Sequence, residues 1–165
     1  MRLETQELSL AYGDVLALRS LSAEVNGRVI GVLGATASGK TSLLQIIAGQ
    51  IKPSGGGVRI DGQDVQPAKR RDLAYVPQEA GFFPYFQRPK ETMSLALALK
   101  GVQASDYPDQ FLDALGLGED DRSASGYSAG MKQKVRIAYA MLHTPRLLVL
   151  DEPMTGLDGG CPARC

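Results

Sequence analysis

The stretch Gly34-Ala35-Thr36-Ala37-Ser38-Gly39-Lys40-Thr41 decides the fold. It fits the pattern G-x-x-x-x-G-K-[ST], a glycine-rich turn that wraps backbone N–H groups around a phosphate group. The apolar run at residues 29–33 predicts a short buried strand before it. A helix is expected from about residue 40 to residue 48, with Leu43, Leu44, Ile47 and Ala48 as its apolar face and Gly49 as its stop. The alternative, a strand-to-helix turn that binds nothing, does not explain why Lys40 and Thr41 are both in place.

Each part of this stretch has a role in holding phosphate. The helix N-terminus carries partial positive charge, Lys40 would neutralise the β- and γ-phosphates, and the hydroxyl of Thr41 would ligate Mg²⁺. The residues expected to contact a nucleotide here are Gly34, Ala35, Thr36, Ala37, Ser38, Gly39, Lys40, Thr41 and Ser42.

Two carboxylates follow another apolar run. Residues 147–150 predict a buried strand, and Asp151 and Glu152 stand at its C-terminal end, where α/β sheets bind ligands. Asp151 would hold Mg²⁺, and Glu152 would polarise the attacking water that phosphoryl transfer requires. Either acid alone could be a surface charge, but together with the phosphate turn they predict a nucleoside triphosphate site.

Short strands and helices fill the rest of the chain. Strands are expected at residues 8–11, 58–60 and 73–76, with turns at residues 54–57 and 61–62. Helices are expected at residues 92–100 and 107–115, after chain breaks at Pro84 and Pro89, and along one face formed by Met131, Val135, Ala138 and Leu142. This alternation of strands and helices predicts an α/β fold with a parallel sheet.

Composition and charge narrow the class of protein. The 165 residues suit one domain, and the balance of 18 Lys plus Arg against 18 Asp plus Glu gives no electrostatic reason to expect nucleic acid. No apolar run approaches the roughly 20 residues needed to cross a bilayer, and residues 1–7 do not resemble a signal peptide. We therefore expect a cytosolic domain. Cys161, Cys165 and the single histidine, His143, predict neither a disulfide framework nor a zinc site.

Five further elements, in this order, resemble the nucleotide-binding domain of ABC transporters. Tyr12 resembles the aromatic residue on which that family stacks adenine, and Gln78 resembles its Q-loop glutamine. Tyr127-Ser128-Ala129-Gly130-Met131-Lys132-Gln133 resembles the LSGGQ signature. Asp151-Glu152-Pro153 resembles the Walker B end with the catalytic glutamate, and Gly156-Leu157-Asp158 resembles the D-loop.

The resemblance implies a fold and a set of site residues. The fold would be a P-loop NTPase with a RecA-like parallel-sheet core, an N-terminal antiparallel β region and a helical insertion. The ABC-type domain would span residues 1–158, with a helical subdomain at about 81–144. The implied catalytic residues are Glu152, Lys40 and Gln78, and the implied Mg²⁺ ligands are Thr41, Gln78 and Asp151. Beyond the phosphate turn, ATP would contact Tyr12, Ser128, Ala129, Gly130 and Asp158.

The resemblance also implies partners. A second ATP-binding domain, identical or different, would complete two composite ATP sites, and a separate transmembrane permease would be driven by them. The protein would then be cytoplasmic and peripheral at the inner face of the membrane, touching the membrane only through that partner. Aromatic residues at 82–86 would form either the docking surface or local core. The stretch 130–133, with residues 99–102, resembles the subfamily that serves ABC-2-type exporters.

Several departures from the family pattern suggest a second interpretation. Ala129 replaces the first signature glycine, Ala37 replaces a glycine of the phosphate turn, and Tyr127 replaces the leading leucine. Residues 159–165 form an atypical tail where the family continues with further strands and a switch histidine, so we expect a truncated or frame-shifted product. The alternative function is a fragment that binds Mg-ATP without effective hydrolysis.

Other P-loop classes fit less well. ABC ATPases of chromosome maintenance and recombination repair have a long coiled coil between the phosphate turn and the signature, and this chain has no sustained heptads there. Translation-associated ABC proteins carry two such domains on one chain. Nucleotide kinases share the phosphate turn but do not explain why Gln78, Ser128 and Asp158 occur together.

Overall fold

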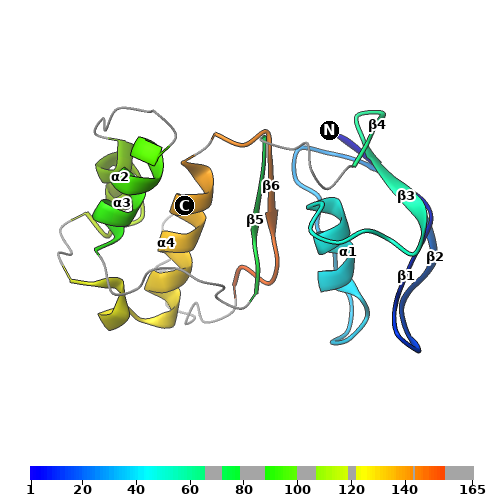
Figure 1. The fold of residues 1–165 in the computed structure, drawn as a ribbon. Coiled ribbons are helices and arrows are strands. Elements are labelled where there is room, and N and C mark those ends of the chain that lie inside the picture. Colours follow the sequence, from blue (N-terminus) through cyan, green and yellow to red (C-terminus); the bar gives the residue numbers. More distant parts are fainter. Residues whose placement is uncertain (66–71, 79–87, 100–106, 119–121, 143, 155–165) are drawn as a thin grey trace. The chain divides into compact units, whose positions relative to one another are not determined.

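The chain folds as two compact units. The computed structural model describes residues 1–65, 72–78, 88–99, 107–118, 122–142 and 144–154, drawn as ribbons in Figure 1. The units are Met1–Leu73 and Ala74–Cys165, and each is described by itself. The helical subdomain predicted at residues 81–144 stays a prediction. The tail predicted at residues 159–165 lies outside the described residues.

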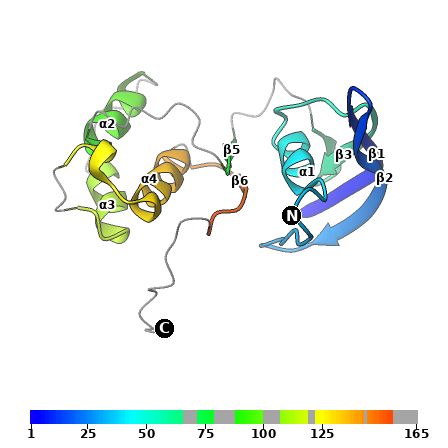
Figure 2. The same cartoon turned by 90° about the horizontal axis from the view of Figure 1, so that it is seen from below.

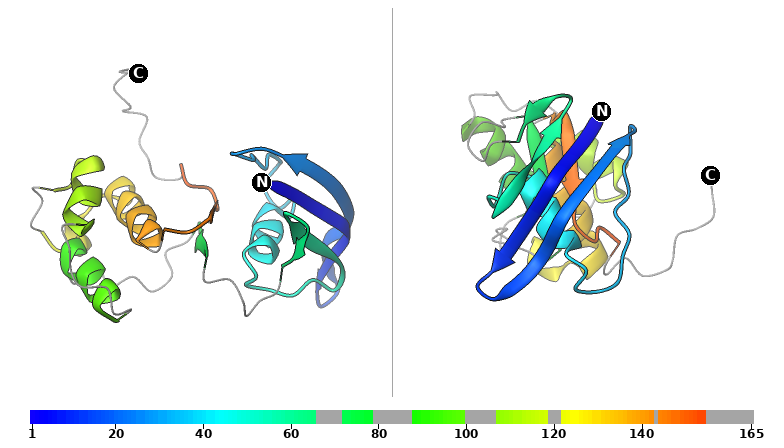
Figure 3. Two further views of the ribbon diagram at one scale, coloured as in Figure 1. Left: turned by 90° about the horizontal axis from the view of Figure 1, so that it is seen from above. Right: turned by 90° about the vertical axis from the view of Figure 1, so that its right-hand side faces the viewer.

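The first unit is an antiparallel sheet with one helix. Its elements are β1 (Arg2–Tyr12), β2 (Val15–Asn26), α1 (Lys40–Ile47), β3 (Gly55–Ile60) and β4 (Gln63–Asp64). The strand order is β2-β1-β3-β4. The sheet curves around α1 (Figure 3). Leu8 and Leu10 are buried, which confirms the alternation predicted for this strand.

The ends of helix α1 agree with the prediction better than its buried face does. Its end at Gly49 is confirmed: Gly49 has a φ of 69°, its N–H donates to the carbonyl of Ile46 at 2.9 Å, and the N–H of Gln50 donates to the carbonyl of Gln45 at 2.8 Å. These two bonds form a Schellman motif. The buried side chains are Ile46, Ile47 and Ala48, whereas Leu43 and Leu44 are only half-buried, so the predicted apolar face was partly wrong.

The two predicted turns around β3 have different outcomes. The turn at Asp61-Gly62 is confirmed, because both residues have positive φ and they join β3 to β4 as a two-residue hairpin. The turn predicted at residues 54–57 is wrong, since Gly55 to Gly57 belong to β3. A bulge explains the difference: Gly56 has a φ of 70°, and the register with β1 shifts between the pairs Gln6–Gly57 and Ser9–Gly55.

The strand predicted at residues 29–33 is not formed. Val29 is 92% exposed and Leu33 is 97% exposed, and the backbone there has no strand assignment. A strand needs hydrogen-bonded neighbours, and in this unit β1 pairs only with β2 and β3, while β3 pairs with β1 and β4. The segment is apolar, but no described strand of this unit pairs with it.

The second unit combines a small sheet with helices. Its elements are β5 (Leu73–Val76), α2 (Pro89–Leu99), α3 (Tyr107–Ala114), a 3₁₀ turn (Ala124–Gly126), α4 (Ala129–Met141) and β6 (Leu147–Leu150). The N–H of Asp151 donates to the carbonyl of Val76 at 3.0 Å, so the C-terminal ends of β5 and β6 lie side by side, as in a parallel pair. Figures 1 and 2 show α4 between this sheet and the other helices.

The helical core lies on one face of α4. Val135, Ala138 and Leu142 are buried there with Met131 packed against them, which confirms the face predicted for this helix. Pro89 begins α2 rather than breaking the chain before it, because proline fits the first turn of a helix, where its missing N–H has no partner to lose. No helix in the described ranges is long and apolar enough to span a membrane.

Candidate nucleotide-binding site

The phosphate turn joins β2 to α1 and is closed around its own lysine. The side-chain Nζ of Lys40 donates to the carbonyls of Gly34 at 3.0 Å and Ala35 at 2.7 Å. The turn itself is tightened by the N–H of Ser38, which donates to the carbonyl of Ala35 at 3.2 Å. The ammonium group therefore lies at the loop backbone, where an arriving phosphate oxygen would replace these carbonyls with a charged acceptor.

Helix α1 starts without a side-chain cap. Gly39 is its N-cap residue and supplies no side-chain acceptor, and the first turn contains no acidic residue. The N–H groups of this turn and the positive end of the helix dipole therefore have no internal anion to neutralise them. Such a helix end is suited to phosphate. Thr41 lies exposed in this first turn, and Ser42 beside it is half-buried.

Left-handed backbone at two positions shapes the turn. Ala37 has a φ of 63° and Gly39 a φ of 88°. This conformation costs a residue that carries a side chain about 1 kcal/mol, so alanine at this position strains the turn. At Gly39 a larger residue would also clash, because an added Cβ would lie 2.5 Å from the carbonyl oxygen of Ala17.

Gly39→Ala is therefore expected to lower the free energy of unfolding by about 3 kcal/mol, from backbone strain plus steric overlap. Gly62→Ala is the matched control, because Gly62 has a similar φ of 78° but nothing within 4 Å of an added Cβ. We expect it to cost about 1 kcal/mol. Urea denaturation of both variants measures the difference, and equal costs would mean that the overlap at Gly39 relaxes freely.

The aromatic residue expected to meet adenine lies at the end of β1. Tyr12 is 49% exposed and pairs with Val15 across the turn at Gly13 and Asp14. Its ring is thus available for stacking on a flat ligand.

The predicted acidic residues are in the second unit, where β6 ends. Asp151 is 1% exposed, and the hydroxyl of Tyr75 on the neighbouring strand lies 3.4 Å from its Oδ2. Glu152, the next residue, is exposed and has a φ of 45°. A left-handed glutamate is uncommon, and such strain concentrates at functional sites.

The structure brings the predicted glutamine and glutamate into contact. The side-chain Nε2 of Gln78 donates to Oε2 of Glu152 at 3.0 Å. This bond leaves the amide oxygen of Gln78 available as a ligand and fixes the carboxylate of Glu152. Gln78 and Glu152, predicted from separate motifs, therefore meet where β5 and β6 end, and Asp151 precedes Glu152 in the chain.

The signature segment begins α4 as expected. Ser128 is its N-cap residue, and its side-chain Oγ accepts from the N–H of Met131 at 3.2 Å. Ala129 is exposed and Gly130 is half-buried in the first turn, which has no acidic residue. This helix end can receive an anion from outside the unit. Asp158, His143 and the aromatic residues at 82–86 lie outside the described residues.

The residue that sequence reasoning missed is Tyr75. It was interpreted only as part of a strand, and its hydroxyl contact with Asp151 joins residues far apart in the sequence. The signal available was its position on the strand that ends at Gln78, since parallel neighbours end at one edge of a sheet.

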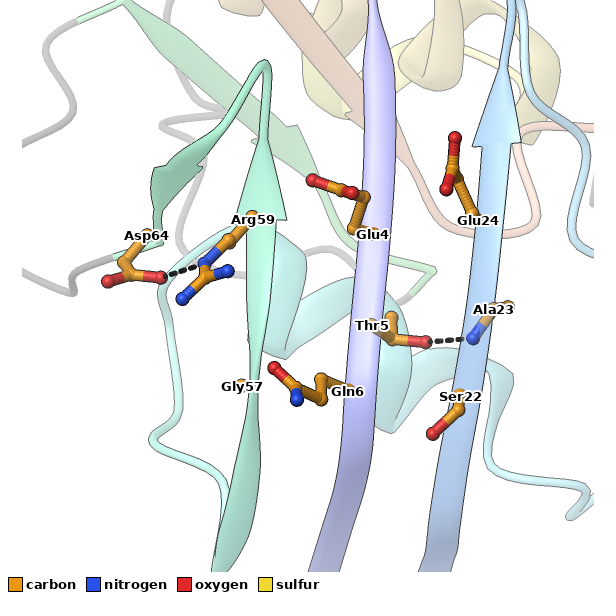
Figure 4. Close-up of a pocket in the computed structure, with 9 residues that line it drawn as sticks. All are labelled: Glu4, Thr5, Gln6, Ser22, Ala23, Glu24, Gly57, Arg59 and Asp64. Carbon is orange, nitrogen blue, oxygen red and sulfur yellow. Dashed lines mark hydrogen bonds and ion pairs between the residues drawn. The ribbon is translucent and has the colours of Figure 1, made fainter.

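A groove in the first unit is not part of this site. The groove has a volume of about 420 Å³. Figure 4 shows its lining residues on β1 to β4, and none of them is a predicted site residue. Its cation is already paired, because Nε of Arg59 donates to Oδ1 of Asp64 at 2.9 Å. That hydrogen bond raises the pKa of Arg59 above its usual value. The groove therefore offers an anion little attraction.

Comparison with known proteins decides the family. The family model described as ABC transporter matches residues 18–155 of the chain. The chain belongs to the ABC transporter family. A solved structure of an ABC transporter's ATP-binding cassette in its ADP conformation aligns with a TM-score of 0.76 at 22% identity, covering 94% of this chain and 70% of that one. This confirms the predicted fold class, a P-loop NTPase with a parallel sheet, an antiparallel β region and helices.

Two relatives illustrate the range of this ABC transporter family. The bacitracin transport ATP-binding protein BcrA of Bacillus licheniformis is 32% identical over 161 residues, covering 94% of this chain and 52% of that protein. The spermidine/putrescine import ATP-binding protein PotA of Legionella pneumophila (strain Paris) is 33% identical over 163 residues, covering 94% and 44%. The chain spans about half the length of the curated relatives it matches.

Proposed function

We propose that this chain is an ATP-binding and ATP-hydrolysing part of a transporter, with its energy delivered to a separate transmembrane permease. The observation that carries the proposal is the N-terminus of α1, which has no side-chain cap and begins with Lys40, in a chain of the ABC transporter family. Together they supply fixed N–H donors and a movable positive charge for the phosphates of ATP.

Magnesium is the metal that the donor set fits. Thr41, Gln78 and Asp151 offer hydroxyl, amide and carboxylate oxygens, which are ligands for a hard cation. The described residues contain no cluster of three or more His, Cys, Asp or Glu side chains that would form a closed metal cage. This agrees with a cation held by one carboxylate together with phosphate oxygens and water. When bound, Mg²⁺ would neutralise charge that develops on the phosphates.

In this proposal the protein's own groups divide the work of hydrolysis. Tyr12 stacks on adenine, and the turn from Gly34 to Ser42 holds the phosphates. Glu152 accepts a hydrogen bond from the attacking water and orients it, while Gln78 fixes the carboxylate of Glu152 through the 3.0 Å bond. Lys40 stabilises charge on the transferred phosphoryl group.

The proposed assembly needs a second ATP-binding domain. Ser128 and Gly130 stand at the N-terminus of α4, and in a head-to-tail dimer they would reach the γ-phosphate bound to the other domain. Asp158 would line the same interface. Alternation between closed and open dimers would drive the permease, and the chain would lie at the cytoplasmic face of the membrane through that partner.

The cargo is not part of the proposal. The two relatives named above are described by different substrates, bacitracin for one and polyamines for the other. The likeness of residues 130–133 to the ABC-2 exporter subfamily stays a proposal beside them. No nucleic acid is expected as a partner, because the net charge is zero.

A second function, binding of Mg-ATP without effective hydrolysis, is favoured by one observation. Ala129 is exposed in the first turn of α4, so its methyl group lies where the family brings backbone close to phosphate. A weakened signature contact would leave ATP binding intact and slow the chemistry.

Phosphate release by the purified protein separates the two functions. We expect a fluorescent ATP analogue to bind, phosphate to be released from ATP only with Mg²⁺, and the rate per molecule to rise with protein concentration as composite sites form. Binding with no release at any concentration would support the second function. Absence of both binding and release would contradict the proposal.

A further inference from the structure

The carboxylate of Asp151 is buried with little hydrogen-bonding support. The residue is 1% exposed, and within the described structure the hydroxyl of Tyr75 is the only hydrogen-bond donor to its side-chain oxygens. Buried carboxylates ordinarily collect two or more donors or a cation, because desolvation of the charge is costly. A single hydroxyl at 3.4 Å does not meet that need.

The two residues are held in register by backbone. The N–H of Asp151 donates to the carbonyl of Val76, the residue next to Tyr75, at 3.0 Å. This bond fixes the end of β6 against the end of β5, so the side chain of Tyr75 and that of Asp151 stay within reach of each other. The contact therefore depends on the sheet and not on a flexible loop.

Asp151 can act as a metal ligand, and the hydroxyl of Tyr75 can hold its carboxylate in place. A phenol hydroxyl that donates to one carboxylate oxygen, Oδ2, leaves Oδ1 for a cation and selects the side-chain rotamer that points it there. Such outer partners typically change metal affinity by about 10- to 100-fold when they are removed. A tyrosine is well suited to the role because its rigid ring fixes the position of the hydroxyl.

We propose that Tyr75 is a positioning residue for the divalent cation of this site, acting through Asp151. The inference rests on the proposed function, since it concerns the cation that accompanies ATP. It adds a residue that none of the recognised motifs supplies and assigns its hydroxyl, not its ring, as the functional group. The ring of Tyr75 is half-buried on β5 and has no part in the proposed role.

Mn²⁺ binding tests the proposal without relying on hydrolysis. With the protein saturated by a non-hydrolysable ATP analogue, the loss of the free Mn²⁺ signal in electron paramagnetic resonance gives a dissociation constant. Tyr75→Phe removes one oxygen and is expected to raise that constant about 10-fold, while metal-free affinity for the analogue stays within about twofold. Tyr139→Phe is the matched control, since Tyr139 packs against the helical core, and it should change neither value.

A second comparison distinguishes positioning from packing. In an Asp151→Asn background, Tyr75→Phe should add no further loss of Mn²⁺ affinity, because the hydroxyl acts only through that carboxylate. Tyr75→Met, which keeps apolar bulk without the ring, should match Tyr75→Phe in Mn²⁺ affinity even if its thermal midpoint is lower. An unchanged constant in Tyr75→Phe, or an equal loss in the Asp151→Asn background, would overturn the inference and leave the proposed function standing. Failure of the wild-type protein to bind Mn²⁺ with the analogue would overturn both.

Discussion

Replacing Glu152 by Gln is expected to lower the rate of ATP hydrolysis by about 10²- to 10⁴-fold, the range that a positioned general base contributes. The amide keeps the shape of the side chain, and its oxygen can still accept the hydrogen bond that Gln78 now donates at 3.0 Å. The negative charge that polarises the attacking water is lost. Affinity for ATP should stay within about twofold, because the phosphates are held by the turn around Lys40.

Phosphate release and equilibrium binding of an ATP analogue measure the two halves of this expectation. Glu24→Gln is the matched control, because Glu24 is exposed on β2 and its partners among the described residues lie on the same sheet. That variant should hydrolyse ATP at the wild-type rate. Hydrolysis at an undiminished rate in Glu152→Gln would remove Glu152 from the mechanism, whereas loss of analogue binding would indicate a role in holding the nucleotide.

Replacing Lys40 by Met is expected to weaken ATP binding by about 100-fold, equivalent to about 2.7 kcal/mol. Methionine retains the apolar stem of this half-buried side chain but removes the charge that now contacts the carbonyls of Gly34 and Ala35. The phosphates would then meet only the N–H groups of the turn. Isothermal titration with ATP and Mg²⁺ gives the affinity directly.

Lys52→Met controls for the loss of one positive charge from the same unit. Lys52 is exposed after the end of α1, so its replacement should change ATP affinity by less than about twofold. Equal weakening by both substitutions would mean that net charge, not contact with phosphate, sets the affinity. Circular dichroism of each variant excludes unfolding as the cause of a loss.

Sequence patterns predicted the local geometry of the motifs well, because each motif is built from neighbouring residues. The uncapped start of α1 and the positive φ at Gly39 follow from the local order of glycine, lysine and threonine. The cap that Ser128 makes to the N–H of Met131 spans three residues. Local hydrogen bonds of this kind depend only on residues close together in the sequence, so the sequence predicts them.

Errors in the fold occurred where pairing or packing with distant residues decides the outcome. The apolar run at residues 29–33 was predicted to be a buried strand, yet Val29 and Leu33 are exposed because no described strand of that unit pairs with them. The glycines at 55–57 were predicted to turn, but they pair with β1 through a bulge. A sequence pattern indicates that a segment can form a strand. Whether the strand forms depends on whether another strand lies beside it.

The sequence alone was sufficient for the family, and it proposed Lys40, Gln78, Asp151 and Glu152 as site residues, since both depend on residue type and short spacing. The tertiary fold decided which of them touch. The contacts of Gln78 with Glu152 and of Tyr75 with Asp151 join the ends of β5 and β6, two strands separated by the whole helical region. Contacts of that range arise because parallel strands place their C-terminal ends at one edge, and no local pattern records which side chains then meet.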